Sequence, residues 1–428
     1  MQFPGGGFDR LTHYVFRYPA KFHPPVARAL IERFTTSGQT VLDPFCGSGT
    51  IAVEARALGR NAIMSDVDPV AVFVSRSKTL IPAIEPLRDA SRSLLDRLSE
   101  MERRESEYER RMFEDISQPS FHAAVRRYKL DIPNIPNINH WFRRYVIVDL
   151  ARIMRVILHG GFRPIHRDIF LLSFAAIIRN ASNADPVPVS GLEVTSHMKR
   201  RDDAGRLINP YALYRRTLDR AINDYERFTG NASQFSTTVK VLKVDATEVD
   251  RYIPSGIDAV ITSPPYHNAV DYYRRHTLEM YWLGFVHDHQ DRLQLLPRYI
   301  GRSRVSKTHP ALQEDLKGCK TAVRWEALLR ARSSERGDAF KHYLVSMRLC
   351  LRALSKLIAR GKPVVFVVGK SSWNGAQIPT VDLFKELGED RFAVKEVLWY
   401  PLKNRYMSYS RHNGASIDQE YVLVLERR

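Results

Sequence analysis

A short glycine-containing turn between an apolar run and a helix-like stretch is the most constraining feature of this sequence. The run Thr40–Phe45 leads into Cys-Gly-Ser-Gly-Thr, and the helix-like stretch Ile51–Leu58 stops at Gly59. A second apolar run, Asn61–Ser65, is followed by an acidic residue and by Val-Asp-Pro, which is typical of the start of another helix, expected to continue to about Lys78. Strands that alternate with helices predict a parallel sheet with crossover helices.

The same alternation returns after a long interruption. Further strands are expected at Val239–Val244, Ile257–Thr262, Pro363–Val368, Val394–Tyr400 and Glu420–Glu426. Apolar residues at intervals of four and three over 340–358 indicate an amphipathic helix packed on the sheet. We therefore expect a seven-stranded, mostly parallel α/β domain formed by residues 1–79 and 237–428. Residues 80–236, with charged helical stretches and Pro- and Asn-rich loops, are interpreted as an inserted, mainly helical domain.

The charge balance of the chain suits a polyanionic partner. Lys and Arg total 65 against 47 Asp and Glu, which gives a formal net charge of +18 and a pI near 9.8. This positive charge favours a partner that carries a dense array of phosphates, although a basic enzyme with an unrelated substrate would have the same composition. The three cysteines lie far apart without a CxxC pair, so neither a metal site nor a disulfide framework is expected. With no signal-peptide pattern and no apolar run longer than Ile169–Ile178, we expect a cytoplasmic protein.

Two features of residues 40–66 suit a nucleoside cofactor. Gly47 and Gly49 let the backbone approach a ligand closely and expose amide groups at the start of a helix. Asp66 ends the second strand, where an acidic side chain can accept hydrogen bonds from two ribose hydroxyls. Each has a plainer interpretation, because Gly-x-Gly turns also occur at ordinary strand-helix junctions and in dinucleotide enzymes, and Asp66 could cap the helix that begins near Asp68.

The residues around this turn resemble a known family. Residues 43–50, Asp-Pro-Phe-Cys-Gly-Ser-Gly-Thr, resemble the S-adenosylmethionine motif of amino-methylating DNA methyltransferases. Residues 16–24 are similar to the segment that closes over the methionine end of the cofactor in that family. The resemblance implies a Rossmann-like S-adenosylmethionine methyltransferase fold, with Asp43 near the cofactor's amino group. The residues it places at the cofactor are Lys21, Phe22, Pro24, Asp43, Pro44, Phe45, Cys46, Gly47, Gly49, Thr50, Asp66 and Asp245.

Two of these residues keep alternative interpretations. Asp245 follows the strand at 239–244, where similar enzymes place a polar side chain against the adenine amino group, but it could equally be an exposed strand-end residue. Cys46 invites comparison with the covalent mechanism of ring-carbon cytosine methyltransferases. Those enzymes have a Pro-Cys pair in the catalytic loop, whereas Cys46 lies in the cofactor turn, so we interpret it as a small packing residue.

The stretch Thr262–Tyr266, Thr-Ser-Pro-Pro-Tyr, directly follows an apolar strand. It resembles the catalytic Ser-Pro-Pro-Tyr motif of DNA methyltransferases that act on cytosine N4, whereas adenine-N6 enzymes more often have Asp or Asn in place of the serine. Ser263 Oγ and the Pro264 carbonyl can accept hydrogen bonds from the base amine and favour a tetrahedral nitrogen, while Pro265 helps to stiffen the loop. Tyr266 offers an aromatic face for a base rotated out of the duplex. An ordinary proline turn is the alternative.

Double-stranded DNA is the expected partner, and basic loops are candidates to contact its phosphates. The target-recognition domain is expected within residues 80–236, with 285–335 as the alternative. The stretch 267–275 is expected to line the base pocket, to contact DNA, or only to begin a helix. The candidate DNA-binding residues are Lys199, Arg200, Arg201, Arg274, Arg275, Arg302 and Arg304, and the same basic stretches include Arg206, Arg215, Arg216, Arg298 and Lys307.

The leading hypothesis is a site-specific DNA methyltransferase acting on cytosine N4, with a cognate restriction endonuclease as a candidate second partner. Adenine-N6 methylation is the nearest alternative, because the same pocket geometry accepts either amine. An RNA guanine-N2 methyltransferase would have a similar glycine turn but Asn or Asp in place of Ser263. A non-catalytic DNA-binding protein on the same fold would have no need of Asp66, Ser263 and Tyr266.

Overall fold

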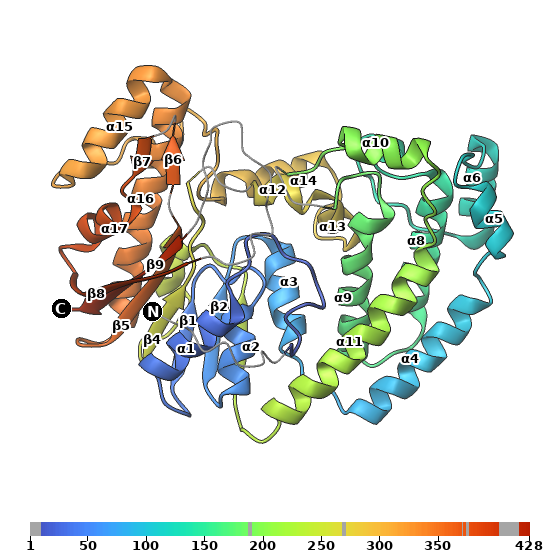
Figure 1. The fold of residues 1–428 in the computed structure, drawn as a ribbon, viewed down its shortest axis with the longest axis horizontal. Coiled ribbons are helices and arrows are strands. Elements are labelled where there is room, and N and C mark those ends of the chain that lie inside the picture. The colour runs from blue at the N-terminus through green and yellow to red at the C-terminus, as the bar shows by residue number, and fades with distance from the viewer. Residues whose placement is uncertain (1–9, 187–190, 268–270, 370, 374–375, 402–418) are drawn as a thin grey trace.

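The computed structural model describes residues 10–186, 191–267, 271–369, 371–373, 376–401 and 419–428. Its centre is a seven-stranded sheet in the order β3-β2-β1-β4-β5-β9-β8 (Figure 1). Within this sheet β9 runs antiparallel to β5 and β8, and the pairs from β3 to β5 are parallel. The strands are β1 (Thr40–Asp43), β2 (Asn61–Ser65), β3 (Val239–Leu242), β4 (Ala259–Thr262), β5 (Pro363–Gly369), β8 (Phe392–Pro401) and β9 (Gln419–Arg427), and a separate hairpin contains β6 (Ser371–Trp373) and β7 (Ala376–Ile378).

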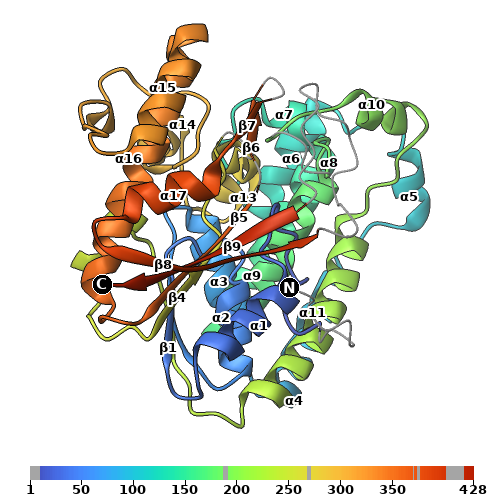
Figure 2. The same cartoon turned by 60° about the vertical axis from the view of Figure 1, so that its left-hand side comes forward.

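Alternate residues of the central strands face two helical layers. Val41 and Ile261 belong to the core shared with α1 (Pro24–Phe34) and α2 (Thr50–Ala57). Leu42 and Val260 belong to the core on the other face, shared with α16 (Ser334–Leu357) and α17 (Thr380–Gly388). Figure 2 shows the sheet between these two layers. Burial on both faces explains the near-continuous apolar central strands. The strand order, with the antiparallel β9 between β5 and β8, confirms the predicted Rossmann-like methyltransferase fold.

Helices occupy the long interval between β2 and β3 in the residues described. The first of them, α3 (Pro69–Lys78), lies against the sheet, and Figure 1 shows the helices that follow it as a lobe beside the sheet. The helices of this lobe are α4 (Ile84–Ser99), α5 (Glu105–Arg110), α6 (Gln118–Tyr128), α7 (Ile138–Trp141), α8 (Arg144–His159), α9 (Pro164–Ala181), α10 (Ser196–Asp203) and α11 (Pro210–Ala232). Between β3 and β5 lie η1 (Ala246–Arg251), α12 (Tyr272–Arg275), α13 (Thr277–Trp282), α14 (His289–Leu295), η2 (Leu296–Arg298), η3 (Pro310–Leu312) and α15 (Lys320–Arg332).

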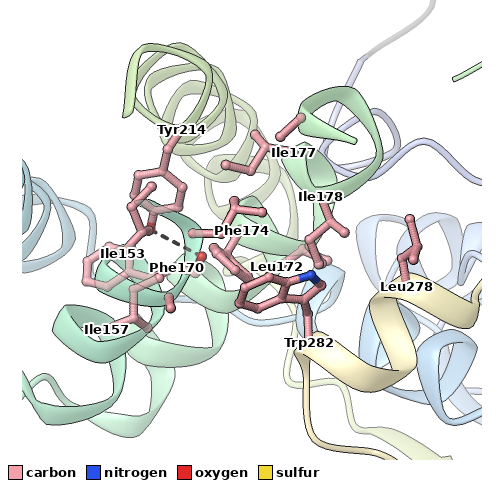
Figure 3. Close-up of a cluster of buried hydrophobic side chains, with 14 of the residues drawn as sticks. Ile153, Ile157, Phe170, Leu172, Phe174, Ile177, Ile178, Tyr214, Leu278 and Trp282 are labelled. Atoms are coloured by element: carbon pink, nitrogen blue, oxygen red, sulfur yellow. Dashed lines mark hydrogen bonds between the residues drawn. The ribbon is translucent and has the colours of Figure 1, made fainter. Parts of the chain in front are cut away.

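The helical lobe shares a hydrophobic core with α3 and α13. Figure 3 shows apolar side chains of α8, α9 and α11 packed together with Trp282 of α13. The ring of Trp282 meets Phe174 edge to face at 5.9 Å, and Tyr214 donates a hydrogen bond to the Phe170 carbonyl at 3.2 Å. Because α13 follows the Ser-Pro-Pro-Tyr motif closely in the chain, this core connects the helical lobe to the neighbourhood of that motif.

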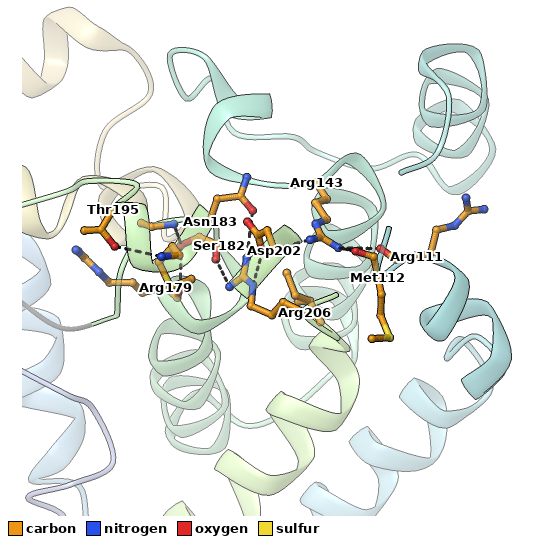
Figure 4. Close-up of polar contacts among 12 residues, drawn as sticks. Arg111, Met112, Arg143, Arg179, Ser182, Asn183, Thr195, Asp202 and Arg206 are labelled. Carbon is orange, nitrogen blue, oxygen red and sulfur yellow. Dashed lines mark hydrogen bonds and ion pairs between the residues drawn. The ribbon is translucent and has the colours of Figure 1, made fainter. Parts of the chain in front are cut away.

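Arginine side chains link the loops of the helical lobe through hydrogen bonds and ion pairs (Figure 4). Arg179 donates to three carbonyl oxygens, including that of Arg275 at 3.1 Å. Arg206 and Arg143 both pair with Asp202, at 2.7 and 3.2 Å. Arg206 is only 9% exposed, so its inclusion among the basic residues facing DNA was wrong: its guanidinium is used inside the protein.

Two expectations on element length and type can be compared with the structure. The strand predicted at Ile257–Thr262 begins only at Ala259, and Ile257 makes an isolated bridge to Ile358. The apolar run Ile169–Ile178, which the sequence left as a helix or a strand, lies within α9. Among the described residues, no helix combines the length and the apolar character that crossing a membrane requires.

Candidate cofactor and catalytic site

A pocket lies at the carboxyl ends of β1, β2 and β4. The strand order places β2 on one side of β1 and β4 on the other, and such switch points are where α/β sheets bind ligands. Of the residues that the sequence proposed, Pro24, Gly49, Pro264 and Tyr266 do not line the pocket. The proposed residues that do line it are Lys21, Phe22, Asp43, Pro44, Phe45, Cys46, Gly47, Thr50, Asp66, Asp245, Ser263 and Pro265.

The glycine turn after β1 depends on both glycines. Gly47 and Gly49 have φ angles of 46° and 74°, a region that strongly favours glycine. A Cβ on Gly49 would lie 2.7 Å from Ser75 Oγ and 2.8 Å from Ser75 Cα. Gly49 therefore lets the start of α2 pack against α3 beneath the pocket, while Gly47 forms part of the pocket wall.

Asp66 and Asp68 accept hydrogen bonds from different backbone amides beside the pocket. Asp68 is the N-cap of α3 and accepts a hydrogen bond from the Val70 amide at 2.8 Å. Asp66 accepts from the Gly47 amide at 2.9 Å and from the Asp68 amide at 3.0 Å, and it lines the pocket. Burial raises the pKa of Asp66 to about 7. Asp66 thus supports the glycine turn and lies on the pocket wall at the end of β2.

One hydrogen bond joins the two sequence motifs. Thr262 Oγ1, at the end of β4, donates to Asp43 Oδ1, at the end of β1, over 2.6 Å. Both residues are buried, and burial raises the pKa of Asp43 to about 7 although this hydrogen bond and one from the Phe45 amide favour the carboxylate. Because Ser263 directly follows Thr262, this bond holds the serine beside the cofactor turn.

Two of the four residues of the Ser-Pro-Pro-Tyr loop line the pocket. Ser263 and Pro265 line the pocket, whereas Pro264 is buried behind it. The half-buried Tyr266 turns toward β9, where its hydroxyl donates to Glu420 Oε1 at 2.8 Å. Residues 268–270, part of the stretch expected to line the base pocket or contact DNA, lie outside the described residues.

The N-terminal segment contributes the opposite wall. Lys21 and Phe22 line the pocket, while Pro24 is a buried residue in the first turn of α1. Lys21 Nζ lies 3.7 Å from the centre of the Tyr14 ring and donates to the His13 carbonyl at 3.3 Å. Burial lowers the pKa of Lys21 to about 8. Among the residues that the structure describes, this ammonium group is one of two basic side chains that line the pocket.

A buried lysine that the sequence gave no reason to single out supports the turn from below. Lys78, at the end of α3, is 0% exposed and donates to the carbonyls of His13 and Ser48, each at 3.2 Å. His13 is itself within 2.7 Å of Glu54 Oε1. Burial lowers the pKa of Lys78. The lysine therefore connects the N-terminal segment to the glycine turn.

Sequence reasoning missed several lining residues. The rings of Tyr18 and Tyr272 stack at 5.9 Å and both line the pocket, as do Arg298 and Tyr299. Tyr18 and Tyr272 lie in the stretches 16–24 and 267–275, both of which the sequence places near the site. No spacing in the sequence indicated that the two rings would stack. The loop at 298–300 offered only a basic residue as a signal, and its position over the pocket depends on tertiary packing.

The structure also bears on the two residues with alternative interpretations. Asp245 lines the pocket and caps η1, accepting from the Thr247 amide at 2.9 Å. Cys46 is 5% exposed and packs within the core between the sheet and α1. Burial and nearby carboxylates raise the pKa of the Cys46 thiol, so it remains protonated. A protonated, packed thiol fits the packing interpretation and is a poor nucleophile.

The proposed DNA-binding residues differ in exposure. Lys199, Arg200 and Arg201 lie exposed on α10. Arg274 and Arg304 are also exposed, and Arg302 is half-buried with a hydrogen bond to the Leu296 carbonyl at 2.8 Å. Arg275 must be corrected: it is 4% exposed, it donates to the Pro186 carbonyl at 3.2 Å, and burial lowers its pKa to about 9. Its side chain points into the protein and not toward a nucleic-acid backbone.

Known proteins resemble this chain in sequence. The N6/N4 methyltransferase family model, described as DNA methylase, matches residues 6–75. The chain is 24% identical to the type II methyltransferase M.MvaI of Kocuria varians over 317 residues, which are 69% of this chain and 63% of the relative. It is 23% identical to the type II methyltransferase M.BsoBI of Geobacillus stearothermophilus over 438 residues, covering 95% of this chain and 83% of the relative.

A shorter match links the chain to an RNA-modifying enzyme. Over 54 residues, 12% of this chain and 16% of the relative, it is 37% identical to the tRNA (guanine(10)-N2)-dimethyltransferase of Methanothermobacter thermautotrophicus. The DNA methylase match covers the glycine turn and Asp66, and the two type II relatives extend over most of the chain. The chain is thus similar in sequence to amino-methylating DNA methyltransferases, most specifically over residues 6–75.

Proposed function

We propose that this chain transfers a methyl group from S-adenosylmethionine to the N4 amine of a cytosine rotated out of duplex DNA. The observation that carries the proposal is the hydrogen bond between Thr262 and Asp43, since it brings Ser263 to the wall of the pocket formed by the glycine turn. A methyl donor and an acceptor amine must lie within a few ångströms of each other in line. One pocket lined by both motifs meets that requirement.

The charges at the pocket fit S-adenosylmethionine better than a dinucleotide. Within the described part of the chain, four carboxylates and two basic side chains line it. The carboxylates are Asp43, Asp66, Asp68 and Asp245, and the basic side chains are Lys21 and Arg298. An acidic wall suits the amino group, ribose hydroxyls and adenine amine of the nucleoside, whereas it would repel a pyrophosphate. Asp66 would bind the ribose and Asp43 would lie near the amino group. When bound, the cofactor supplies a methyl group on a positively charged sulfur.

Ser263 and its loop would prepare the base. The amine lone pair of cytosine is delocalised into the ring, and hydrogen bonds from the amine to Ser263 Oγ and the Pro264 carbonyl favour the tetrahedral nitrogen that can attack. The adjacent prolines restrict the loop, so these acceptors need little reorganisation. After transfer, the nitrogen releases a proton to water. Acceptors, and not a general base of high pKa, are therefore what the loop must provide.

The identity of the base is tested by methylation with purified full-length protein. Mixed-sequence duplex DNA and bulk transfer RNA are each incubated with labelled cofactor, digested to nucleosides and separated. We expect N4-methylcytosine from DNA, because serine stands at the first position of the loop motif. N6-methyladenine in its place would refute the cytosine assignment, and label in RNA N2-methylguanosine without label in DNA would refute DNA as the substrate.

Cofactor affinity is expected to depend on pH. The pKa values of Asp43 and Asp66 are both raised to about 7, so both carboxyls become protonated below that pH. Protonation removes the negative charge facing the cofactor's amino group and an acceptor for the ribose, so affinity should fall between pH 7.5 and 6, by up to about tenfold per group per pH unit below its pKa. Calorimetry across this range measures it. Asp43→Asn should flatten the profile, and an equally steep profile in that variant would contradict the assignment.

We propose that the helical lobe takes part in target recognition, with α10 contacting the DNA backbone. The triple variant with alanine at Lys199, Arg200 and Arg201 should bind all duplexes more weakly and reduce the slope of log K against log salt by up to about 0.9 per lost phosphate contact. Alanine at Lys356 and Arg360, exposed near the start of β5 and thus at the end of the sheet opposite the pocket, is the control. Equal slopes in both variants would exclude α10 from the interface.

A further inference from the structure

A carboxylate on β9 binds the tyrosine of the Ser-Pro-Pro-Tyr loop. Glu420 on β9 lies directly opposite Gly369 of β5 and Tyr400 of β8 in the antiparallel register. Side chains opposite each other in such pairs point to the same face of the sheet. Tyr400, Glu420 and Gly369 therefore form one row across three strands at the edge nearest the loop.

Tyr266 fills the gap that Gly369 leaves in this row. A Cβ on Gly369 would lie 2.6 Å from Tyr266 Cε2 and 3.0 Å from its Cζ, so the ring rests directly on the backbone of β5. From there the Tyr266 hydroxyl donates to Glu420 Oε1 at 2.8 Å. The hydroxyl of Tyr400, a residue 4% exposed, donates to the other oxygen, Glu420 Oε2. Both carboxylate oxygens of Glu420 thus hold tyrosine hydroxyls.

The backbone of Tyr266 is held as well. A Cβ on Gly301 would lie 3.0 Å from the Tyr266 carbonyl oxygen, which shows that the basic loop after η2 packs directly on this residue. Tyr266 is consequently restrained at three places: its backbone carbonyl, one edge of its ring and its hydroxyl. A tyrosine hydroxyl that donates its proton to a carboxylate cannot donate it to a base, so the contact proposed for the base is the aromatic surface of the ring.

We propose that Glu420 is a positioning residue for the extruded base: it anchors the Tyr266 hydroxyl so that the ring presents a fixed surface for stacking beside Ser263. This inference rests on the proposed function. It assigns a role in the base step to a residue 154 positions away in sequence from the loop, outside both motifs. It predicts that substitution of Glu420 weakens stacking of the extruded base on Tyr266. Cofactor binding should stay intact, since Glu420 is not among the residues that line the pocket.

The test uses the full-length chain and a duplex carrying 2-aminopurine at the modified position, once that position is mapped. Glu420→Ala and Tyr266→Phe should each reduce the fluorescence increase on binding and slow single-turnover methylation about 10- to 100-fold, the range for a lost hydrogen bond to a charged group. S-adenosylmethionine affinity should stay within about twofold, because neither residue lines the pocket. Glu420→Gln, which keeps an acceptor, should lose less than Glu420→Ala.

A double variant separates positioning from general damage. If the two residues act through one bond, Tyr266→Phe combined with Glu420→Ala should be no more than about twofold slower than the worse single variant. Glu426→Gln is the matched control: Glu426 lies on the same strand and pairs with Lys395 on the exposed sheet surface, and it should behave as wild type. Additive losses, or a parallel loss of cofactor affinity, would overturn the proposal.

Two further readouts keep the outcome unambiguous. Should Glu420→Ala fail to fold, Gly369→Ala tests the same idea, because its methyl group would displace the Tyr266 ring and should lower the 2-aminopurine signal similarly. Wild-type protein that methylates DNA, together with an unchanged base signal in Gly369→Ala, would refute only the positioning role. Wild-type protein that methylates no DNA would refute the proposed function itself.

Discussion

Replacing Ser263 with alanine is expected to slow methyl transfer by about 10²-fold or more while S-adenosylmethionine affinity changes less than about twofold. The serine lines the pocket and, in the proposed mechanism, supplies an acceptor used when the base amine becomes tetrahedral. Removing one such preorganised hydrogen-bonding group from a transition state has an effect of this size. The backbone of the loop and the bond from Thr262 to Asp43 remain in place. Single-turnover rates and calorimetric cofactor binding measure the two quantities separately.

The neighbouring threonine provides the contrast. Thr262→Val keeps the shape of the side chain but removes its hydroxyl, which leaves Asp43 without a 2.6 Å hydrogen bond in a buried site. We expect that variant to lose cofactor affinity as well as rate, because the two motifs share this bond. If Ser263→Ala weakened cofactor binding as much as Thr262→Val does, the serine would be a structural residue and its proposed role would fail.

Gly49→Ala is expected to abolish measurable cofactor binding at micromolar concentration and to lower the free energy of unfolding by about 2–4 kcal/mol, from left-handed strain together with overpacking. Gly49 has a φ of 74°, and a methyl group there would lie 2.8 Å from the backbone of α3 at Ser75. The helix cannot move without moving the turn, whose next glycine, Gly47, forms the pocket wall. Chemical denaturation and calorimetry report the two effects.

Gly38→Ala isolates the contribution of close packing. Gly38 has a similar φ of 85°, but no atom lies within 4 Å of the position its Cβ would take. It should therefore show only the strain of a left-handed residue, about 1–2 kcal/mol, and bind cofactor normally. A Gly49→Ala protein that binds cofactor as well as Gly38→Ala would show that the contact between the turn and α3 is unimportant for the site.

Local sequence patterns predicted most of the fold and part of the site. The strand, glycine turn and helix at 40–58 are encoded by neighbouring residues, and they appear where the sequence predicted them. Twelve of the residues proposed for cofactor and catalysis line one pocket, because both motifs end parallel strands that lie side by side in the sheet. Charge alone was a poorer guide: Arg275 belongs to a basic stretch, yet its position in the fold buries it.

The sequence by itself determined that a glycine turn, an acidic strand end and a Ser-Pro-Pro-Tyr loop would stand at the carboxyl ends of parallel strands. These are short-range features, and backbone conformation after a strand depends mainly on the few residues that follow it. Only the tertiary structure decided which side chains from distant segments would meet: Thr262 with Asp43 across 219 positions, and Tyr266 with Glu420 across 154. Such contacts depend on strand order and register, and no local pattern in a single sequence specifies them.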